Sequence, residues 1–345
     1  MAATIRDVAR AAGVSVATVS RVFNASGPVK DETQRRIREV ALALRYSPNG
    51  AARSLTTNRT STLGVLLPDL YGEFFSEVIR GVDQMAQEHG YHILVSSSHN
   101  VPSEIAAALT AMRGRVDGVV IMSPAIDAAT LGENLPATLP VVLLNCAVQG
   151  TEFDALGIDN YGGAHSMVRH LVDSGRKRIA MICGATGNGD AAARLLGYRA
   201  ALDEAGIERR HEWEMSGDFL ERSGFSAAER LLRLSPRPDA IFAANDSMAI
   251  GAMSALQAAA CRVPDDIAVA GFDDIPISRY MSPPLTTIRI DIAGLGGRAV
   301  RALVRAVGSK NAHERRQEIL PAELVVRESC GARQAAEMQA VGGGR

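Results

Sequence analysis

Three side chains near the N-terminus have the types and the spacing that read DNA. The stretch TIRDVARAAGVSVATVSRVFN begins at Thr4, and in it Val16, Ala17 and Arg21 lie off the expected core of a helix. An arginine can donate two hydrogen bonds to a guanine edge, and valine and alanine can contact a thymine methyl group. Nearby polar side chains can donate to phosphates, namely Thr4, Ser15, Thr18, Ser20 and Asn24. The pattern predicts base contacts by the first set and backbone contacts by the second.

A second set of polar and aromatic side chains follows the apolar runs of the chain. Carboxylate, amide and guanidinium groups can bond vicinal hydroxyls, and an aromatic face can cover the C–H side of a sugar ring. The expected ligand contacts are Phe74, Ser123, Asn145, Asp190, Arg194, Phe219, Asn245 and Asp273. We expect Phe75 to be core as readily as contact, and Asp246 to cap the helix at Ser247. The mixture suits a neutral carbohydrate better than a hydride cofactor.

The DNA-reading residues are expected on a head of three helices. Apolar positions at i, i+3, i+4 and i+7 begin at Ile5, and Gly13 ends this helix because glycine readily adopts a positive φ. Thr4 with Asp7 resembles a capping box, and Ser15 can cap the second helix. The predicted core faces are Ile5, Val8, Ala9 and Ala12, then Val19, Val22 and Phe23, then Ile37, Val40, Ala41 and Leu44. Two short helices around a glycine turn, braced by a third, predict a helix-turn-helix unit.

From Thr62 onward, short apolar runs alternate with helical stretches. The runs LGVLLP, YHILVSS, DGVVIM and PVVLLN are typical of buried parallel strands, and RIAMIC, DAIFAA and IAVAGF form a second series. Helices are expected at 75–89, 104–112, 191–205, 224–234 and 247–259. Two such series predict an α/β core of two parallel-sheet lobes with helices on both faces. Because ligands bind at the carboxyl ends of such strands, this core is expected to gather the second set of residues.

Length and charge exclude several classes of protein. At 345 residues the chain suits two or three domains, and no apolar run reaches the roughly 18 residues of a membrane span. The charged first ten residues lack the apolar stretch of a secretory signal, so we expect a cytoplasmic protein. Residues 1–60 carry ten basic and four acidic side chains, an excess of six positive charges in a chain of net charge −1. A basic head on an acidic body predicts a polyanionic partner.

The motifs of the head and of the segment after it resemble those of the LacI/GalR family of bacterial transcription regulators. The string V-S-x-x-T-V-S-R-V-x-N, followed by YSPNGAARSL, carries the resemblance, which extends to about residue 328. It implies that Val16, Ala17 and Arg21 read bases, and this Val-Ala pair resembles the galactose-regulator branch. It also implies that Arg53 and Leu55 act in a minor-groove hinge, where an apolar wedge kinks DNA.

The same resemblance implies a body like that of periplasmic sugar-binding proteins. The chain would cross between the lobes near Asn160, Arg289 and Pro321, and Arg194 and Asp273 would hold effector hydroxyls. Ile290 departs from the lactose repressor, which has a polar pocket residue there, so the hydroxyl pattern of the effector stays open. The expected division is 1–46 helix-turn-helix, 47–60 hinge and linker, 61–330 effector-binding and dimerisation domain, and 331–345 disordered tail.

These patterns predict a homodimeric repressor, and they predict that a small carbohydrate controls its affinity for the operator. Operator DNA, the effector and a second copy of the chain are the expected partners, and no cofactor, metal or catalytic residue is expected. The tail after Ser329 has no leucine heptad that would build a tetramer. Two alternatives stay open: a purine or nucleoside effector, and a sugar-binding protein without a regulatory role. The glycine-rich loop CGATGNG could cradle a dinucleotide, but the rest of the fingerprint of an oxidoreductase is missing.

Overall fold

The computed structural model describes residues 3–24, 27–47, 59–124, 126, 128–146, 153–309 and 314–332. They fall into two compact units. The head is the chain up to Ser61 together with Gly114–Asp117, and the body is the remainder. The expected hinge residues Arg53 and Leu55 and nearly all of the expected tail lie outside the described residues.

Three helices form the head: α1 (Ile5–Ala11), α2 (Val16–Asn24) and α3 (Asp31–Ala43). The backbone N–H and the hydroxyl of Thr4 both donate to Asp7 Oδ2, at 3.0 and 2.7 Å, so the expected pairing at the start of α1 is present. Gly13 has a φ of 63°, which glycine adopts without a Cβ penalty. Ser15 Oγ then accepts from Thr18 N at 3.1 Å and begins α2 as an N-cap.

The head has its own small apolar core. Val8, Val19 and Ile37, one from each helix, are fully buried, and Ala9, Ala12, Val22 and Ala41 complete the cluster. Phe23 and Tyr46 pack edge to face with ring centroids 5.7 Å apart. The prediction that Leu44 faces the core is wrong, because this side chain is 38% exposed at the end of α3. The core therefore fixes α2 against α1 and α3, with the other face of α2 exposed.

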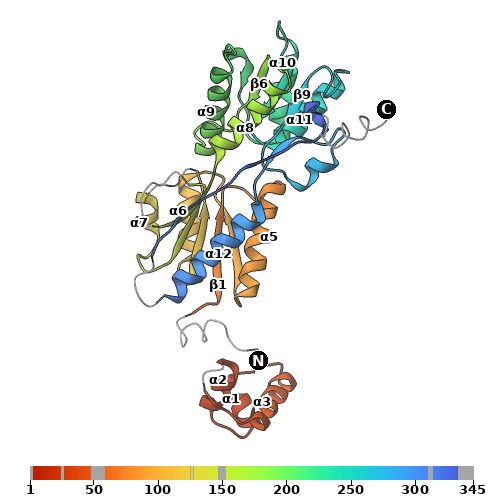
Figure 1. The fold of residues 1–345 in the computed structure, drawn as a ribbon. Helices are drawn as coiled ribbons and strands as arrows, with labels where there is room; N and C mark the ends of the chain where they lie inside the picture. Colours follow the sequence, from red (N-terminus) through yellow and green to blue (C-terminus); the bar gives the residue numbers. More distant parts are fainter. Residues whose placement is uncertain are drawn as a thin grey trace, which may run out of the picture. The chain divides into compact units, whose positions relative to one another are not determined.

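The N-terminal lobe of the body is built on a six-stranded parallel sheet with the order β11-β5-β4-β3-β1-β2. Its strands are β1 (Thr62–Leu67), β2 (His92–Ser97), β3 (Gly118–Met122), β4 (Val141–Leu144), β5 (Asp154–Ile158) and β11 (Gln317–Leu320). Its helices are α5 (Glu73–Glu88), α6 (Pro102–Met112), α7 (Ala128–Asn134) and α12 (Ile292–Gly308). Strands β3 and β4 are buried at every residue, because helices cover both faces of the sheet (Figure 1).

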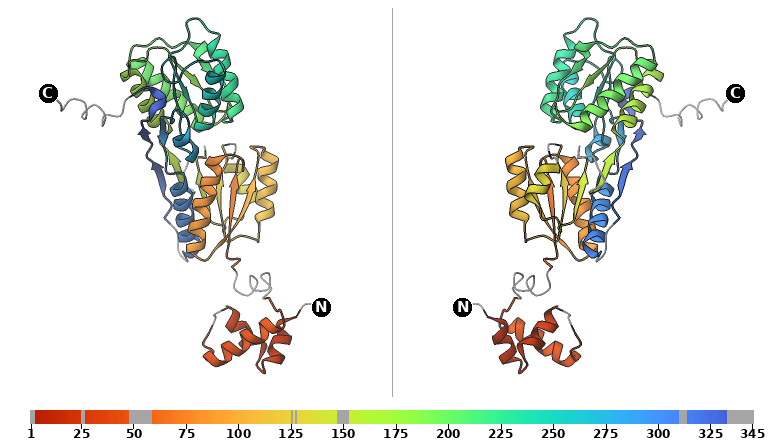
Figure 2. Two further views of the ribbon diagram at one scale, coloured as in Figure 1. Left: turned by 90° about the vertical axis from the view of Figure 1, so that its right-hand side faces the viewer. Right: turned by 90° about the vertical axis from the view of Figure 1, so that its left-hand side faces the viewer.

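Helices α5 and α12 are far apart in the sequence but lie side by side on this lobe (Figures 1 and 2). Their approach depends on glycine. A Cβ added to Gly81 on α5 would lie 1.9 Å from the carbonyl oxygen of Ala293, and one on Gly296 of α12 would lie 2.5 Å from the carbonyl oxygen of Val78. The two helix backbones therefore contact each other directly.

The C-terminal lobe repeats the architecture with a four-stranded parallel sheet of order β7-β6-β8-β9. Its strands are β6 (Ile179–Ile182), β7 (Glu214–Met215), β8 (Ala240–Ala243) and β9 (Ala268–Ala270). Its helices are α8 (Asn160–Asp173), α9 (Gly189–Glu204), α10 (Glu221–Leu232) and α11 (Asp246–Ala258). Short 3₁₀ turns complete it at His211–Trp213, Pro276–Tyr280 and Glu328–Cys330. The predicted fold class of the body is confirmed.

The chain passes between the lobes three times. It leaves the first sheet after β5 to begin α8, returns from β10 (Thr287–Arg289) to α12, and leaves again from β11 to β12 (Glu323–Val325). Strands β10 and β12 pair antiparallel, so two of the crossings are hydrogen-bonded to each other. These positions agree with the crossings expected near Asn160, Arg289 and Pro321. Among the described residues, no helix is long and apolar enough to cross a membrane.

Candidate functional site

The exposed face of α2 carries the residues expected to read bases. Val16 is 42% exposed, and Ala17 and Arg21 are also exposed, while Val19 and Val22 on the opposite side are buried. Their exposure leaves these three side chains accessible to a partner surface. The head thus presents a short apolar and cationic face on one helix.

The residues expected to contact phosphates are partly engaged with one another. Asn24 Nδ2 donates to Ser20 Oγ at 3.1 Å, and the hydroxyls of Ser15 and Thr18 lie 2.8 Å apart. The Thr4 hydroxyl donates to Asp7. A hydroxyl that accepts one hydrogen bond still has a proton to donate, so these contacts leave Ser15 and Ser20 able to meet an anion.

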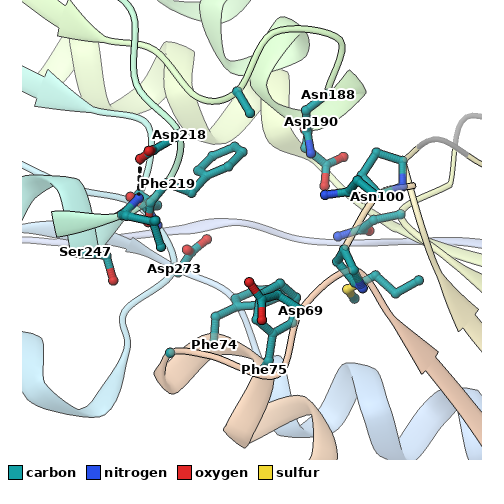
Figure 3. A pocket seen from close by; sticks show the side chains of 18 of the residues that line it. Asp69, Phe74, Phe75, Asn100, Asn188, Asp190, Asp218, Phe219, Ser247 and Asp273 are labelled. Atoms are coloured by element: carbon teal, nitrogen blue, oxygen red, sulfur yellow. Dashed lines mark hydrogen bonds between the residues drawn. The ribbon is translucent and has the colours of Figure 1, made fainter. Parts of the chain in front are cut away.

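The body contains a cavity of about 450 Å³ between its lobes, at the carboxyl ends of the strands. Figure 3 shows Phe74 and Asp69 on the side of the N-terminal lobe, facing Phe219, Asp218 and Asp190 of the C-terminal lobe. Of the eight predicted ligand contacts, seven line the cavity: Phe74, Asn145, Asp190, Arg194, Phe219, Asn245 and Asp273. The structure brings together residues that span 200 positions of the chain.

Ser123 is the predicted contact that the structure does not bring to the cavity. Its neighbours Met122 and Pro124 line the wall, whereas the Ser123 side chain is fully buried and its N–H donates to Cys146 Sγ at 3.4 Å. Side chains of extended chain alternate between faces, so the residue between two wall residues faces away. The position of Ser123 at the end of a strand did not reveal to which side its side chain points.

Arg194 is the polar centre of the cavity wall. Its Nε donates to Asn160 Oδ1 at 2.8 Å, its Nη1 donates to the carbonyl oxygen of Ala244, and its Nη2 lies 3.3 Å from Asp273 Oδ1. The guanidinium carbon lies 3.7 Å from the centre of the Phe272 ring. Because burying an unpaired cation is costly, these contacts are what allow Arg194 to be almost wholly buried.

Two carboxyl groups near Arg194 have raised pKa values. Burial raises the pKa of Asp273 to about 7, against the opposing attraction of Arg194 and with a further rise caused by Asp190. Burial also raises the pKa of Asp190, while Arg194 and the hydrogen bond from Asn160 lower it. Carboxyl groups with perturbed pKa values that converge on a cavity are typical of binding sites.

Hydrogen bonds from neighbouring segments hold Asp273 in a strained backbone conformation. Asp273 and Asp274 have φ values of 108° and 55°, which side chains other than glycine rarely adopt. Asp273 N donates to the carbonyl oxygen of Ile288 at 2.7 Å, and Asp274 accepts from Arg289 at 2.7 Å and from Arg327 at 2.6 Å. These partners belong to the crossing segments, so the crossings position a residue of the cavity wall. Strain of this kind persists only where surrounding contacts overdetermine it.

The amide of Asn245 joins the aromatic wall to a helix. Its Nδ2 donates to the carbonyl oxygen of Phe219, and its Oδ1 accepts from Met248 N, both at 2.9 Å. Asn245, not Asp246, is therefore the N-cap of α11, which corrects the sequence prediction. Asp246 is fully buried and accepts from Ser278, Thr287 and the backbone N–H of Ile275. Asn is as good an N-cap as Asp, so the sequence did not decide between them.

The sequence left Phe75 open between core and ligand contact, and it did not reveal several other wall residues. Phe75 lines the cavity and packs edge to face on Phe74, with centroids 5.3 Å apart. Asn188 also lines it and caps α9 through Ala191 N at 2.9 Å, so the glycine-rich loop CGATGNG forms a helix start in the wall. The remaining missed polar residues are Asp69, Tyr71, Glu73, Asn100, Thr186, Asp218 and Ser247. Sequence proximity to Phe74, Phe219 or Asn245 was the available signal for Asp69, Glu73, Asp218 and Ser247, whereas Asn100 follows the end of β2.

Comparison with known proteins places both parts of the chain. Residues 4–49 match the family described as bacterial regulatory proteins of the lacI family, and residues 168–330 match the periplasmic binding protein-like domain. The HTH-type transcriptional repressor PurR of Mannheimia succiniciproducens is 37% identical over 330 residues, covering 95% of this chain and 98% of that protein. The ribose operon repressor of Escherichia coli K12 is 35% identical over 322 residues, covering 92% and 97%.

Solved structures agree. The lac repressor dimer bound to operator and the anti-inducer ONPF aligns with a TM-score of 0.85 at 29% identity, covering 96% of this chain and all of that one. The complex of the regulator CelR with cellobiose aligns with a TM-score of 0.70 at 31% identity, covering 95% and 99%. A helix-turn-helix head and a two-lobed body with a ligand cavity define a DNA-binding transcriptional regulator. The chain belongs to the lacI family of bacterial regulatory proteins.

Proposed function

We propose that the protein is a cytoplasmic repressor that binds a pseudo-palindromic operator as a homodimer and releases or grips it according to a small molecule in the cavity. The observation that carries this proposal is the pairing of an exposed Val16–Ala17–Arg21 face on α2 with a polar cavity between two lobes. Each head reads one half-site, because a recognition helix enters the major groove with its N-terminal residues.

The proposed contacts to DNA are of two kinds: contacts to bases, which read the sequence, and contacts to phosphates, which position the head. Arg21 bonds a guanine edge, Val16 and Ala17 contact thymine methyl groups, and Thr4, Ser15, Thr18, Ser20 and Asn24 hold phosphates. In the hinge, Arg53 and Leu55 enter the central minor groove, where the leucine opens a base step. Replacing Leu55 with alanine should weaken binding to an operator with a central CG step, whereas unchanged affinity would remove the hinge from the proposal.

A selection experiment tests the DNA-binding part. The full chain is used to enrich a random duplex library, and the enriched operator is titrated at several salt concentrations. We expect one pseudo-palindromic motif and a steep fall of affinity with salt, because phosphate contacts release counterions. A library that shows no enriched motif, or an affinity independent of salt, would contradict the proposal.

The effector we propose is a small carbohydrate. Asn145, Asp190, Asn245 and Asp273 supply acceptors for hydroxyls, and Phe74 and Phe219 supply aromatic faces for the C–H side of a ring. Two relatives support this choice, since one is named a ribose operon repressor and another was solved with cellobiose. Arg194 and Asp273 hold adjacent hydroxyls in this proposal, as members of one ion pair.

A purine is the second candidate effector, favoured by the relative named PurR and by the two aromatic rings on opposite sides of the cavity. A base can stack on Phe74 or Phe219 as a sugar can. Thermal melting of the full chain with D-ribose, D-glucose, D-galactose, cellobiose, hypoxanthine and inosine separates the candidates, because a bound ligand stabilises the folded state. A shift confined to the purine compounds would replace the carbohydrate proposal.

Ligand binding reaches the head through the lobes. A ligand that bridges both lobes favours one closure of the body, and it can shift the population only by its difference in affinity for the two closures. Because Asp273 is hydrogen-bonded to the crossing segment at Ile288, and α12 after that crossing packs against α5, closure moves elements of the N-terminal lobe. The N-terminal lobe follows the hinge in the chain and transmits the change to it.

A further inference from the structure

The cavity wall has an unusual excess of acid. Its described residues include five carboxyl groups, those of Asp69, Glu73, Asp190, Asp218 and Asp273. Against them the described part of the wall has one basic side chain, Arg194, and neither lysine nor histidine. Even with Asp273 protonated, four carboxyl groups would remain. A ligand in the cavity therefore meets a negative field.

The single cation is already used by the protein. Arg194 donates to Asn160 and to the carbonyl oxygen of Ala244, lies 3.3 Å from Asp273, and stacks on Phe272. Two of its five N–H groups donate to these acceptors, and the Asp273 carboxyl group lies beside Nη2 and offsets the charge, so the remaining N–H groups can meet ligand hydroxyls. Arg194 thus organises the wall and does not offer an unmatched positive charge to a ligand.

The helix ends at the cavity are also neutralised. The N-termini of α5, α9 and α11 all contribute residues to the wall, and free helix N-termini attract phosphate. In α5 and α9 the first turn carries an acid of the wall, Glu73 or Asp190. In α9 and α11 the caps Asn188 and Asn245 each occupy a backbone N–H. The positive ends of α5 and α9 therefore face protein carboxyl groups, and the end of α11 is capped by Asn245.

Two buried acceptors at the wall lack donors. Asn145 Oδ1 and Asp273 Oδ1 have no hydrogen-bond partner among the described residues, although the latter is in ion-pair range of Arg194. Asp69 is half-buried and Asp218 is exposed, and in the described hydrogen bonds only Oδ1 of each accepts, from backbone N–H groups, so their second oxygens can accept from a ligand. Such a wall is matched by a ligand that donates hydrogen bonds and carries no negative charge.

We infer that the cavity selects uncharged, hydroxyl-rich effectors and rejects their phosphorylated or carboxylated counterparts through the acids of its wall. This inference rests on the proposed function, because it concerns the effector of the same site. The fold alone does not determine whether the cavity accepts a negatively charged ligand, whereas the acids of this wall do.

Matched ligand pairs test the inference on the full chain. Binding is measured by calorimetry and thermal melting for D-ribose and D-ribose 5-phosphate, D-glucose and D-glucose 6-phosphate, cellobiose and cellobionate, and inosine and inosine 5′-monophosphate. We expect one neutral compound to bind and its anionic partner to bind at least about 100-fold more weakly, given several like charges at close range. An anionic member that binds as tightly as its partner, or the absence of binding by every neutral compound, would overturn the inference.

A charge-removal variant tests the cause. Asp69→Asn with Asp218→Asn keeps each Oδ1 acceptor and removes two negative charges, so the preference for the neutral member should shrink by tenfold or more. Asp265→Asn is the matched control, because Asp265 is an exposed acid of the C-terminal lobe away from the wall and paired with Arg262. An unchanged preference in the double variant would overturn the electrostatic cause. Operator binding without any compound, measured on the same proteins, separates this failure from failure of the proposed function.

Discussion

Arg194 Nη2 lies 3.3 Å from Asp273 Oδ1, and the two side chains are only 5% and 6% exposed. Arg194 comes from the first half of α9, whereas Asp273 follows β9 and is hydrogen-bonded to the crossing segment before α12. One ion pair therefore joins the cavity wall to the connection between the lobes. The pair is costly to break, because the buried acceptors of Asn160 and Ala244 would lose their donor and the Asp273 carboxyl group would have to take up a proton to stay buried.

Arg194→Ala should lower the free energy of unfolding by about 3–5 kcal/mol, the usual cost of breaking a buried ion pair. It should also remove ligand-induced stabilisation, because Asp273 and Asn160 lose the group that orients them. Chemical denaturation of the full chain measures the first effect and thermal melting with the neutral sugars measures the second.

The matched control is Arg298→Ala. Arg298 lies 2.7 Å from Glu318 but is 45% exposed, and exposed pairs contribute less than about 1 kcal/mol. Equal destabilisation by the two alanine variants would mean that the buried geometry at Arg194 has no special role.

Stability should depend on pH through Asp273. Burial raises the pKa of its carboxyl to about 7, above the value of about 3.9 in an unfolded chain. Between these two pH values the folded state holds a proton that the unfolded state has lost. The contribution of Asp273 to the stability of the protein is therefore greatest below about pH 4 and is lost as the pH rises through 7. The slope for one such group is at most about 1.4 kcal/mol per pH unit.

We therefore expect Asp273→Asn to reduce the fall in unfolding free energy between pH 5 and pH 8. A residual fall should remain because of Asp246. Burial, together with the nearby Asp273 carboxyl group, raises the pKa of Asp246 to about 8. Denaturation curves at four pH values measure both slopes. The same slope in the wild type and the variant would show that Asp273 ionises in the folded state as it does in the unfolded chain.

Arg21→Ala should weaken binding to the enriched operator by about 1–3 kcal/mol, the value of one good side-chain contact to a base. It should also relax the preference at one position of each half-site. Arg38→Ala, an exposed arginine on α3, serves as the control and should alter affinity without altering the preferred sequence. Competition binding with single-base operator variants decides the matter, and a preserved preference in Arg21→Ala would remove this residue from base reading.

Gly81→Ala should destabilise the body by more than about 2 kcal/mol, because its methyl group would overlap the carbonyl oxygen of Ala293 and separate α5 from α12. Gly132→Ala in α7 is the matched control. Nothing lies within 4 Å of its added Cβ, and alanine favours a helix over glycine by about 1 kcal/mol. Denaturation should thus move in opposite directions for the two variants, and stabilisation by Gly81→Ala would contradict the close packing of these helices.

The sequence allowed the main elements to be predicted because their patterns are local. The runs behind β1, β3, β4, β6 and β8 are continuous and apolar, as buried parallel strands are. Strands β7, β10 and β12 are only two or three residues long and were not predicted, and the longer strands β5 and β11 were also missed. Helices α7, α8 and α12 were missed too. In α12, glycines at 294, 296 and 297 weaken the helical preference. Its close packing against α5 compensates for that weakness.

Prediction of the cavity was successful for residues at strand ends and failed where tertiary packing decides. Seven predicted contacts line the wall because the carboxyl ends of parallel strands share an edge. Ser123 is not in the wall, because its side chain points to the other side of the extended chain. The choice of Asn245 over Asp246 as helix cap depends on the contacts of Asn245 with Phe219 and of Asp246 with Thr287. The charge of the wall was not foreseen, because Asp69, Glu73 and Asp218 become neighbours only in the folded lobes.

The central claim is that a ligand in the cavity controls the affinity of the head for DNA. Anisotropy of a labelled operator duplex, titrated with the full chain in the presence and absence of saturating neutral sugar or inosine, tests it directly. We predict that one compound changes the dissociation constant by about 5- to 150-fold, the usual range of allosteric coupling, and that Asp273→Asn abolishes the change. An operator affinity that stays the same with every compound, or that changes equally in Asp273→Asn, would contradict the account.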